Sequence, residues 1–263
     1  MQVKSKFVLS IVCTTALVAC GGGGSDASSA ASTPGQAQGV YSGSFSSVAF
    51  NPGKFNALIL DNDEFWTLYG LEGSGGELRV YGLIQGQGAA SSGSFSSSNL
   101  KDYYYDGTTA SGSLSATYTP GTSFVGTVSS SGRSVSFSGA APAANSSAYN
   151  YNTAATISSI TGAWSGTNMS GVTSTYTIAS NGTFSGVNQY GCGFSGTLTP
   201  RASGKNVFDV ALTNNTDAAC GIASGLVGRG VALTSLLTGG SRQLIVAVVT
   251  NDRAYGSAIF ATR

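Results

Sequence analysis

The sequence predicts an all-β protein with two tandem antiparallel β-barrel or β-sandwich modules of about eight strands each. From residue 39 onward, apolar and polar residues alternate with the period of a strand that has one buried face. Gly, Asn, Ser or Pro interrupt this alternation about every 8 to 12 residues, which is typical of short strands joined by turns. No part of this region shows a helical period over an ordinary helix length.

The composition excludes several classes of function. The chain of 263 residues contains no His, so Ser-His-Asp and Cys-His catalytic groups and His-containing metal sites are excluded. Only 9% of the residues are charged and the net charge is +1, which offers no basic surface for a nucleic acid. We therefore expect a protein that is not an enzyme, uses no cofactor or metal, and binds no nucleic acid.

The first 19 residues predict an export signal. Lys4 and Lys6 precede an apolar stretch, residues 7–19, that is too short to span a bilayer. The segment Leu17–Cys20 resembles the bacterial lipobox, which implies cleavage before Cys20 and diacylation of its thiol. An ordinary signal peptide that happens to contain Cys20 is the alternative. The lipobox predicts a mature protein anchored to a membrane through lipid without crossing it.

Residues 20–38 predict a lipidated Cys followed by a flexible tether. The tract is rich in Gly, Ser and Ala and has no apolar period with which to pack. Residue 21 is Gly, whereas an Asp there marks retention in the inner membrane in the Gram-negative lipoproteins that this segment resembles. We therefore expect the outer membrane of the cell envelope, on either its periplasmic or its extracellular face.

The first module, residues 39–140, is predicted from a series of short alternating segments. One hairpin is clear, because Leu58 and Leu60 can share a face with Trp66 and Leu68 across the polar turn 61–64. The candidate strands of this module are 39–47, 57–60, 65–69, 77–86, 111–118, 122–129 and 133–139.

The second module, residues 161–263, follows a predicted linker at 141–160 that is rich in Ala, Asn and Ser. The continuous apolar run Leu244–Val249 predicts a strand that is covered on both faces or closed inside a barrel. The candidate strands are 162–169, 173–179, 182–188, 192–199, 205–213, 222–235, 243–249 and 254–262.

A weak internal repeat supports the division into two modules. Residues 39–43 and 162–166 share the pattern Gly, small or apolar, aromatic, Ser, Gly, and each segment opens a series of strands. A single module of about sixteen strands is the alternative. A transmembrane barrel is not favoured, because it predicts aromatic girdles and no lipid anchor at the front of the chain.

Two cysteines remain after cleavage and lipidation, Cys192 and Cys220. In an oxidising envelope compartment such a pair predicts a structural disulfide within the second module. A redox-active pair is the alternative, but the close Cys-x-x-Cys spacing is missing.

Two Tyr-rich segments are the candidate binding surface: Tyr103, Tyr104 and Tyr105 in one, and Tyr149 and Tyr151 in the other. Three consecutive Tyr residues in an extended chain cannot all point into one core, so at least one should face solvent or a neighbour. Exposed Tyr suits protein or glycan recognition, because it offers a large contact area with few rotatable bonds. Alternatively, these rings cover a barrel rim or the seam between the modules.

Three other motifs are explained without a function. Residues 191–196 match G-x-G-x-x-G, but a strand and a turn follow instead of the helix that a dinucleotide site needs. Residues 98–101 match S-x-x-K, which also needs a helix. The acidic segment 61–64 could offer oxygen ligands to calcium, but a polar hairpin turn accounts for it.

Three segments together resemble a group of uncharacterised proteobacterial lipoproteins: Leu17–Cys20 with its Gly-rich tether, Leu58–Tyr69, and Gly191–Arg201. The resemblance spans most of the chain and implies no assigned activity. At the level of architecture, a tethered lipoprotein with two barrel-like modules also resembles the factor H-binding and transferrin-binding surface lipoproteins.

We therefore predict a membrane-anchored envelope lipoprotein that acts as a non-enzymatic binding or interaction module, with an unknown protein, glycan or apolar ligand as partner. One alternative is a lipocalin-like carrier with a small apolar ligand in a barrel interior. Another is a glycan-acting enzyme that uses Asp, Glu, Tyr or Lys on a β scaffold.

Overall fold

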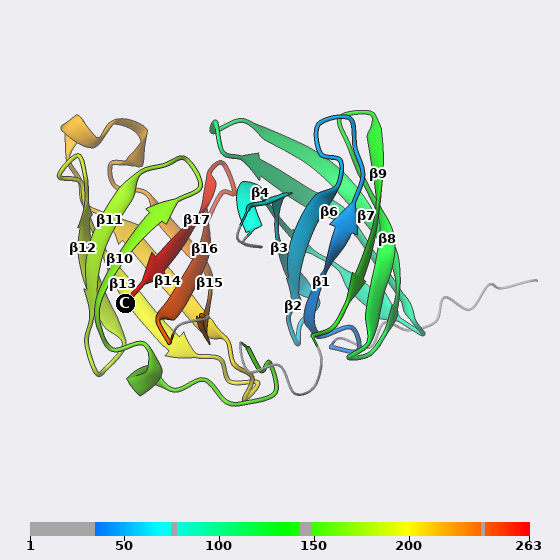
Figure 1. Ribbon diagram of the computed structural model, residues 1–263. Helices are drawn as coiled ribbons and strands as arrows, with labels where there is room; N and C mark the ends of the chain where they lie inside the picture. The colour runs from blue at the N-terminus through cyan, green and yellow to red at the C-terminus, as the bar shows by residue number, and fades with distance from the viewer. Residues whose placement is uncertain (1–34, 75–77, 143–148, 238–239) are drawn as a thin grey trace, which may run out of the picture. The chain divides into compact units, whose positions relative to one another are not determined.

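The computed structural model describes residues 35–74, 78–142, 149–237 and 240–263, and their regular structure is almost entirely β-strand. Two short 3-10 helices, η1 (Ile157–Ser159) and η2 (Ala218–Ala223), are the only helices in these ranges. Figure 1 shows the strands in two closed sheets, one from blue to green along the chain and one from green to red. The all-β prediction is confirmed.

The first sheet is a closed antiparallel barrel of eight strands with one short additional strand. Its circuit runs β4-β3-β2-β1-β9-β8-β7-β6, pairing of β6 with β4 closes it, and β5 lies alongside β6. The strands are β1 (Gly39–Phe45), β2 (Gly53–Ile59), β3 (Glu64–Glu72), β4 (Leu78–Gln87), β5 (Ala89–Ser91), β6 (Ser94–Tyr104), β7 (Thr109–Thr119), β8 (Ser123–Ser130) and β9 (Arg133–Ala140).

The second sheet is a closed barrel in which each strand pairs with its neighbour in sequence and the last strand pairs with the first. Its strands are β10 (Gly162–Asn168), β11 (Thr173–Ile178), β12 (Thr183–Asn188), β13 (Gly193–Pro200), β14 (Phe208–Asn214), β15 (Val227–Leu236), β16 (Arg242–Thr250) and β17 (Gly256–Thr262). The two sheets are thus barrels rather than sandwiches, and they do not merge into a single module.

The strand alternation places apolar side chains inside each barrel. Rings fill much of the first interior, where Phe124 contacts Tyr41, Phe95 and Phe137 at centroid distances of 5.4 to 5.5 Å. Glycines let these rings lie directly on the opposing backbone: a Cβ on Gly88 would lie 2.2 Å from the ring of Phe95. The second interior contains a separate buried cluster that includes Trp164, Tyr176, Ile178, Phe184, Leu198, Phe208, Val210 and Leu244.

A third apolar cluster forms between outer faces of the two barrels, which belong to one compact unit, residues 31–263. From the first barrel, β2 to β4 contribute Leu58, Trp66 and Leu83, and from the second, β15 to β17 contribute residues such as Val231 and Ala247. We call this cluster the seam. These strands therefore bury residues on both faces, and in β16 this accounts for the continuous apolar run Leu244–Val249.

The run Leu244–Val249 confirms the prediction made from it. Leu244 and Val246 point into the second barrel, whereas Ala247 and Val249 belong to the seam. Polar contacts also cross the seam. Arg229 donates to the Glu64 carboxylate at 2.7 Å, and Arg201 donates to Asp61 at 2.5 Å.

The folded part begins earlier than the sequence predicted, because residues 35–38 are not tether. Ala37 is fully buried, and its carbonyl accepts a hydrogen bond from the Tyr41 hydroxyl at 3.0 Å. The N–H of Gly35 donates to the buried Asp63 carboxylate at 2.9 Å. These contacts fix the segment against the end of the first barrel where β1 begins.

The predicted linker at 141–160 is also partly integrated into the fold. Tyr151 is buried in the seam, and Ile160 is fully buried in the core of the second barrel. The hydroxyl of Tyr149 donates to the carbonyl of Asn206 at 2.6 Å. Residues 149–160 therefore belong to the second module, and residues 143–148 lie outside the described ranges.

The sequence missed strands β5 and β6. The first half of β6 is Ser-rich, and its register to β7 shifts between Ser97 and Leu100. Such a bulge breaks the period-two pattern on which the prediction depends. The strand nevertheless closes the barrel, and it carries Tyr103 and Tyr104 of the candidate binding surface.

The predicted signal peptide, the lipidated Cys20 and the tether up to residue 34 lie outside the described residues. Within the described ranges, no helix has the length and apolar character needed to cross a membrane.

Candidate functional site

Strand β6 places its last residues on two different faces of the first barrel. Asp102 and Tyr104 point inward, whereas Tyr103 lies in the seam on the outer face. Tyr105 follows the strand and is 49% exposed. Alternation along an extended chain therefore separates the three Tyr side chains, as the sequence indicated.

A buried carboxyl group lies inside the first barrel near the end where β6 stops. Asp102 is only 7% exposed, and the hydroxyl of Tyr69 donates to its two carboxylate oxygens at 2.9 and 3.1 Å. Tyr69 lies on β3 and pairs with Gly82 on β4, whose other neighbour is β6. Because Gly82 has no side chain, the Tyr69 ring can cross β4 and reach Asp102; a Cβ on Gly82 would lie 2.3 Å from that ring.

Burial dominates the electrostatics of this carboxyl. Removal from water raises the pKa of Asp102 to about 6, although hydrogen bonds from the hydroxyls of Tyr69 and Tyr104 lower it in part. Burial and the neighbouring carboxylate also raise the pKa of Tyr104, to about 12. Asp102 is therefore mostly ionised at neutral pH, and both hydroxyls remain protonated.

A continuous row of aromatic rings connects this carboxyl to the surface. The ring of Tyr105 contacts that of Tyr81 at 5.5 Å, and Tyr81 contacts Phe50 at 5.5 Å. Phe50 contacts Tyr69 at 5.9 Å, and Phe45 lies 5.7 Å from Phe50. We call these rings, together with Tyr104 and Asp102, the mouth cluster.

The mouth cluster lies at one end of the barrel, which we call its mouth. Phe45 is the last residue of β1, Tyr104 is the last of β6, and β4 begins a few residues before Tyr81. In an antiparallel barrel these strand ends meet at the same rim. The connection 46–52, which carries Phe50 and the fully exposed Val48, belongs to this rim.

A β-bulge directs Tyr81 to the mouth. Tyr69 pairs with Gly82 and Gly70 pairs with Val80, so Tyr81 is an extra residue on β4. Bulges are frequent at barrel rims and beside binding sites, where they redirect a side chain. The extra residue interrupts the alternation of side chains along β4, and the ring of Tyr81 contacts Phe50 at the mouth.

The structure separates the five Tyr residues that the sequence singled out. Tyr104 and Tyr105 belong to the mouth cluster, whereas Tyr103, Tyr149 and Tyr151 pack in or against the seam. Tyr103 is 1% exposed, its ring lies against Gly256, and its hydroxyl donates to the carbonyl of Arg253 at 3.1 Å. The interpretation of Tyr103 and Tyr151 as surface residues is thus corrected, because these rings pack where two apolar barrel faces meet.

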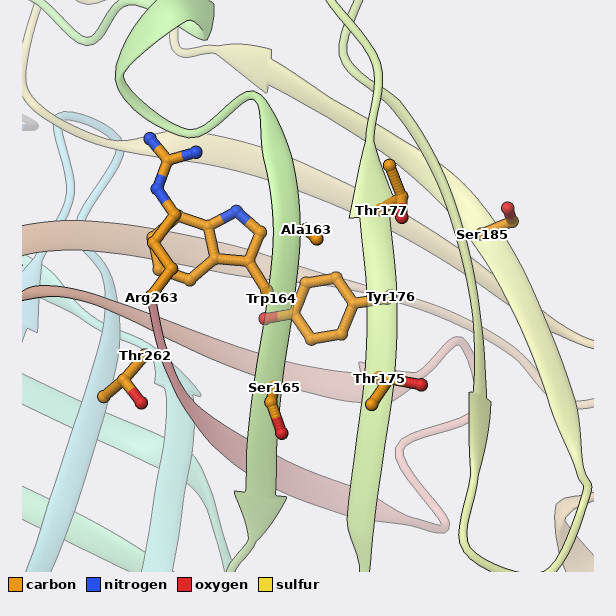
Figure 2. Close-up of a pocket in the computed structure, with 9 residues that line it drawn as sticks. All are labelled: Ala163, Trp164, Ser165, Thr175, Tyr176, Thr177, Ser185, Thr262 and Arg263. Atoms are coloured by element: carbon orange, nitrogen blue, oxygen red, sulfur yellow. The ribbon is translucent and has the colours of Figure 1, made fainter.

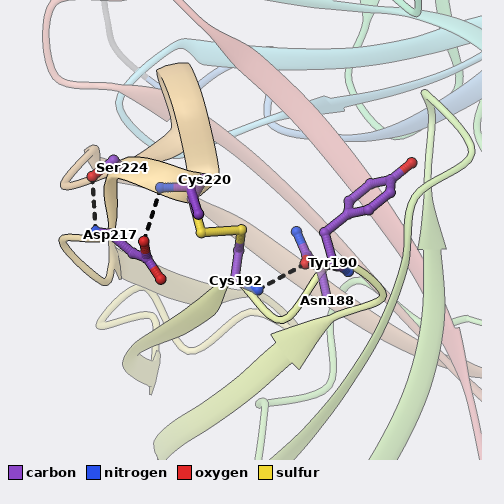
Figure 3. Close-up of a disulfide and its surroundings, with 7 residues drawn as sticks. Asn188, Tyr190, Cys192, Asp217, Cys220 and Ser224 are labelled. Carbon is purple, nitrogen blue, oxygen red and sulfur yellow. Dashed lines mark hydrogen bonds between the residues drawn. A yellow bond between two sulfur atoms is a disulfide. The ribbon is translucent and has the colours of Figure 1, made fainter.

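The disulfide Cys192–Cys220 is present, as predicted, with a Cα–Cα distance of 5.7 Å. It joins the turn after β12 to helix η2, so it links two connections of the second barrel rather than two strands (Figure 3). The side chain of Asn188 accepts the N–H groups of Tyr190 and Cys192 at 2.9 and 3.0 Å. Tyr190 is 71% exposed, and Figure 3 shows its ring directed away from the disulfide.

A shallow groove of about 430 Å³ lies on the second barrel (Figure 2). Its exposed residues from β10 to β12 are small, such as Ser165, Thr175 and Ser185. The guanidinium of Arg263 lies 4.6 Å from the Trp164 ring and donates to the carbonyls of Ser159 and Thr161. The exposed side chains of this groove are thus mostly short hydroxyl groups, its two aromatic residues, Trp164 and Tyr176, belong to the buried core, and its one cation is already bonded to backbone carbonyls.

The acidic turn 61–64 has structural partners. Asp61 pairs with Arg201, Asp63 accepts the N–H groups of Gly35 and Ala90, and Glu64 pairs with Arg229. Within the described ranges, no group of three or more His, Cys, Asp or Glu residues could hold a metal ion. The S-x-x-K segment 98–101 lies on strand β6, and residues 193–196 of the G-x-G-x-x-G segment lie on β13, so neither opens a helix.

Comparisons with known proteins show no family for this chain. No family model matches this chain, and no curated protein matches it at a significant level. A solved structure with some likeness is a protein of unknown function of the DUF3598 family from Nostoc punctiforme. It is 11% identical, the match covers 86% of this chain and 95% of that one, and the TM-score is 0.26.

Sequence reasoning missed five members of the mouth cluster: Phe45, Phe50, Tyr69, Tyr81 and Asp102. For Asp102 a signal was present, because Leu100, Asp102 and Tyr104 alternate with Lys101 and Tyr103. An acid at an inward position of a strand is unusual and indicates a special environment. The bulge at Tyr81 and the contact across Gly82 have no comparable sequence signal.

Proposed function

We propose that the protein is an envelope lipoprotein, anchored in the outer membrane through lipid on Cys20, that acts by binding rather than by catalysis. Its ligand lies against the mouth cluster of the first barrel. The observation that carries this proposal is the row of rings that leads from exposed Tyr105 to the buried Asp102.

The mouth suits binding because it combines rigid support with accessible rings. Tyr81 and Tyr104 extend from strands of a closed barrel, so their backbone positions are fixed. Both rings are half-buried, and Tyr105 offers its ring and hydroxyl to solvent. Tyr side chains contribute large contact areas at low entropic cost.

The opposite end of the first barrel is less suited to a ligand. Ala37 and the buried Asp63 hold residues 35–38 against it, and the Tyr41 hydroxyl is already bonded there. A ligand at that end would have to displace a segment of the chain. At the mouth, a ligand would replace ring contacts of Phe50 in the connection 46–52 without breaking a strand pair.

The envelope location rests on the lipobox and the Gly-rich tract, and both lie outside the described residues. The partners that fit are a membrane, through the lipid, and a protein, glycan or small molecule at the mouth. The architectural resemblance to factor H-binding and transferrin-binding lipoproteins is consistent with this division of roles.

The barrel interiors do not favour the carrier alternative. The rings of Phe95 and Phe124 contact one another in the first interior, and the ring of Phe95 lies directly on the backbone of Gly88. An apolar ligand in the lumen would need that space. Native mass spectrometry of the purified protein tests this alternative, because a carrier would show a co-purified lipid or small molecule.

Photo-crosslinking in intact cells tests the binding proposal. A photoreactive amino acid replaces Tyr105 at the mouth, which is 49% exposed, or Tyr190 on the second barrel, which is 71% exposed and serves as a more accessible control. We expect a ligand adduct, detected by mass spectrometry, at position 105 and not at 190. Adducts only at 190, or at neither position, would contradict the proposal.

The anchor is tested separately with a clickable palmitate analogue. We expect label on the full chain, and none on the Cys20→Ala variant, whereas Cys192→Ala should be labelled normally. Protease treatment of intact and lysed cells then distinguishes the extracellular from the periplasmic face.

A further inference from the structure

We propose that the mouth of the first barrel binds an organic ammonium cation, whose charge faces Asp102 and whose carbon substituents lie against the aromatic rings. This inference rests on the proposed function and specifies the chemical class of the ligand. It follows from the charge, the hydrogen bonding and the surroundings of the mouth cluster.

The first argument is an uncompensated charge. Among the described residues, the ion pairs are Lys54–Glu72, Arg201–Asp61, Arg201–Asp209 and Arg229–Glu64, and none involves Asp102. Its hydrogen-bond donors are uncharged: hydroxyl groups and a backbone N–H. A buried carboxylate without a cationic partner is costly, so a bound cation would be favoured.

The second argument is the ring environment. Phe50 contacts Tyr69 at an interplanar angle of 87° and Tyr81 at 68°, and the hydroxyl of Tyr69 donates to the carboxyl, so this row of rings presents both edges and faces beside the site. Ring faces attract cations through their quadrupole, and they do so more strongly when water is excluded. Carbon groups on the cation would also gain apolar contact with the same rings.

The chemistry favours an organic cation over a metal ion. Calcium takes six to eight oxygen ligands and magnesium demands octahedral oxygens. Asp102 is a single carboxylate bonded to Tyr hydroxyls, and within the described ranges no group of three or more His, Cys, Asp or Glu residues could hold a metal ion. An alkylammonium group needs one counter-charge and an apolar surround, which the mouth supplies.

The connection 46–52 provides a route to the carboxyl. Its hydrogen bonds that the structure shows run within the connection, between Ser47 and Phe50 and between Ser46 and Asn51. Phe50 is thus held over Tyr69 by ring contacts with Phe45, Tyr69 and Tyr81. A ligand can replace these contacts with its own without breaking a strand pair.

Calorimetric titration of the full chain in a non-ionic detergent tests the inference. The probes are choline and its neutral isostere 3,3-dimethylbutan-1-ol, which has a carbon in place of the charged nitrogen and otherwise the same shape. We expect choline to bind at least about tenfold more tightly than the isostere. Asp102→Asn should weaken choline binding by a similar factor and leave the isostere unchanged.

A matched control and the outcomes keep the two proposals distinguishable. Asp217→Asn removes one carboxylate from the second barrel and should not change the affinity for choline. Equal binding of choline and the isostere would overturn the cation inference, while the binding function would stand. A photo-adduct at Tyr105 with no ammonium binding would likewise overturn only the inference.

The pH dependence gives an independent readout. Tyr69, Tyr104, Asp106 and Arg133 are the other titratable groups around Asp102 and Tyr104. Between pH 5 and 8 both Tyr hydroxyls stay protonated, because burial raises their pKa values, and Asp106 stays ionised, because the hydrogen bonds that it accepts from Thr108 lower its pKa. Choline affinity should therefore rise with pH through about 6, as Asp102 ionises. A flat profile would contradict the role of this carboxyl.

The ammonium group could belong to a free metabolite or to a lipid headgroup. Titration with a short-chain phosphatidylcholine below its micellar concentration distinguishes these sources. Binding equal to that of choline indicates that the mouth accepts a headgroup, and loss of binding indicates a free cation. If choline, the short-chain phosphatidylcholine and butylammonium all fail to bind, the inference is contradicted.

Discussion

The two barrels share one contact at their first strand and differ in their buried charges and crosslinks. In the first, the Tyr41 hydroxyl donates to the carbonyl of Ala37, and in the second, the Trp164 indole donates to the carbonyl of Ile160. Both aromatic residues belong to the repeated segments, and both donate four residues back along the chain. The repeat therefore specifies one local device, an inward aromatic side chain that ties the entering chain to the barrel end.

The two barrels differ in their charged groups and in their irregular or crosslinked segments. The first barrel buries an acid, Asp102, under aromatic rings and has a bulge that redirects Tyr81. The second has a disulfide between two connections, and its Arg263 cation is already bonded to backbone carbonyls. The second barrel thus has a covalent link between two of its connections, whereas the first contains a buried carboxyl without a cationic partner among the described residues.

Removal of the disulfide has the largest expected effect and tests whether the barrels are independent. The Cys192→Ala/Cys220→Ala variant should lose about 3–4 kcal/mol of unfolding free energy, because the bridge closes a separation of 28 residues. Trp164 lies in the core of the second barrel, so its fluorescence in a Trp66→Phe background reports the unfolding of that barrel. Trp66 lies on the seam face of the first barrel, and the unfolding midpoint that it reports in a Trp164→Phe background should shift less. An equal shift of both signals would mean that the seam unfolds the barrels together.

Asp102 should destabilise the first barrel as pH rises. Its pKa is raised from 3.8 to about 6, so the unfolded chain ionises first as the pH rises, and the folded state loses stability progressively between these two values. The contribution is on the order of 2–3 kcal/mol, absent below pH about 4 and complete above about 6. Urea unfolding of the wild-type chain and Asp102→Asn measures it as the difference between the two curves. A difference that is constant from pH 4 to 8 would contradict the burial of an ionisable carboxyl.

Gly82→Ala should disrupt the crossing of Tyr69 over β4. The new Cβ would lie 2.3 Å from the ring, and such overpacking costs about 1–3 kcal/mol. Gly107→Asn is the control, because no atom lies within 4 Å of the added Cβ and Asn tolerates its φ of +86°. In the Gly82→Ala background, Asp102→Asn should change the unfolding free energy by less than it does in the wild-type chain. Full retention of that effect would show that Tyr69 does not depend on Gly82.

Tyr41→Phe has the smallest expected effect and tests the shared device. Loss of the hydroxyl leaves the Ala37 carbonyl without this donor and should cost about 0.5–1.5 kcal/mol. Tyr190→Phe, at an exposed position, should leave the unfolding free energy unchanged. Thermal unfolding of both variants measures the difference. No effect at Tyr41 would remove the physical basis of the repeat.

The sequence predicted those parts of the fold that depend on local pattern. Alternation located most strands, and the run Leu244–Val249 revealed a strand with two buried faces. The sequence did not reveal the limits of the folded part, because Ala37 and Tyr151 are buried by contacts with residues distant in sequence. A tract of small and polar residues has the same composition whether it is free or packed against a barrel.

The candidate site was predicted only in part for a similar reason. Consecutive Tyr residues indicated that Tyr105 should be exposed, since alternation is local. The contact of Tyr69 with Asp102 joins β3 to β6 across Gly82, and the position of Tyr81 depends on one extra residue in β4. Such contacts depend on the register between strands, which composition and periodicity do not determine.

The most direct test of the central claim is NMR of the full chain with isotopically labelled Tyr rings, before and after addition of choline. The account predicts shifts for Tyr69, Tyr81, Tyr104 and Tyr105 in the first barrel and none for Tyr176 and Tyr190 in the second. Shifts confined to the second barrel, or absent from the mouth cluster, would contradict it.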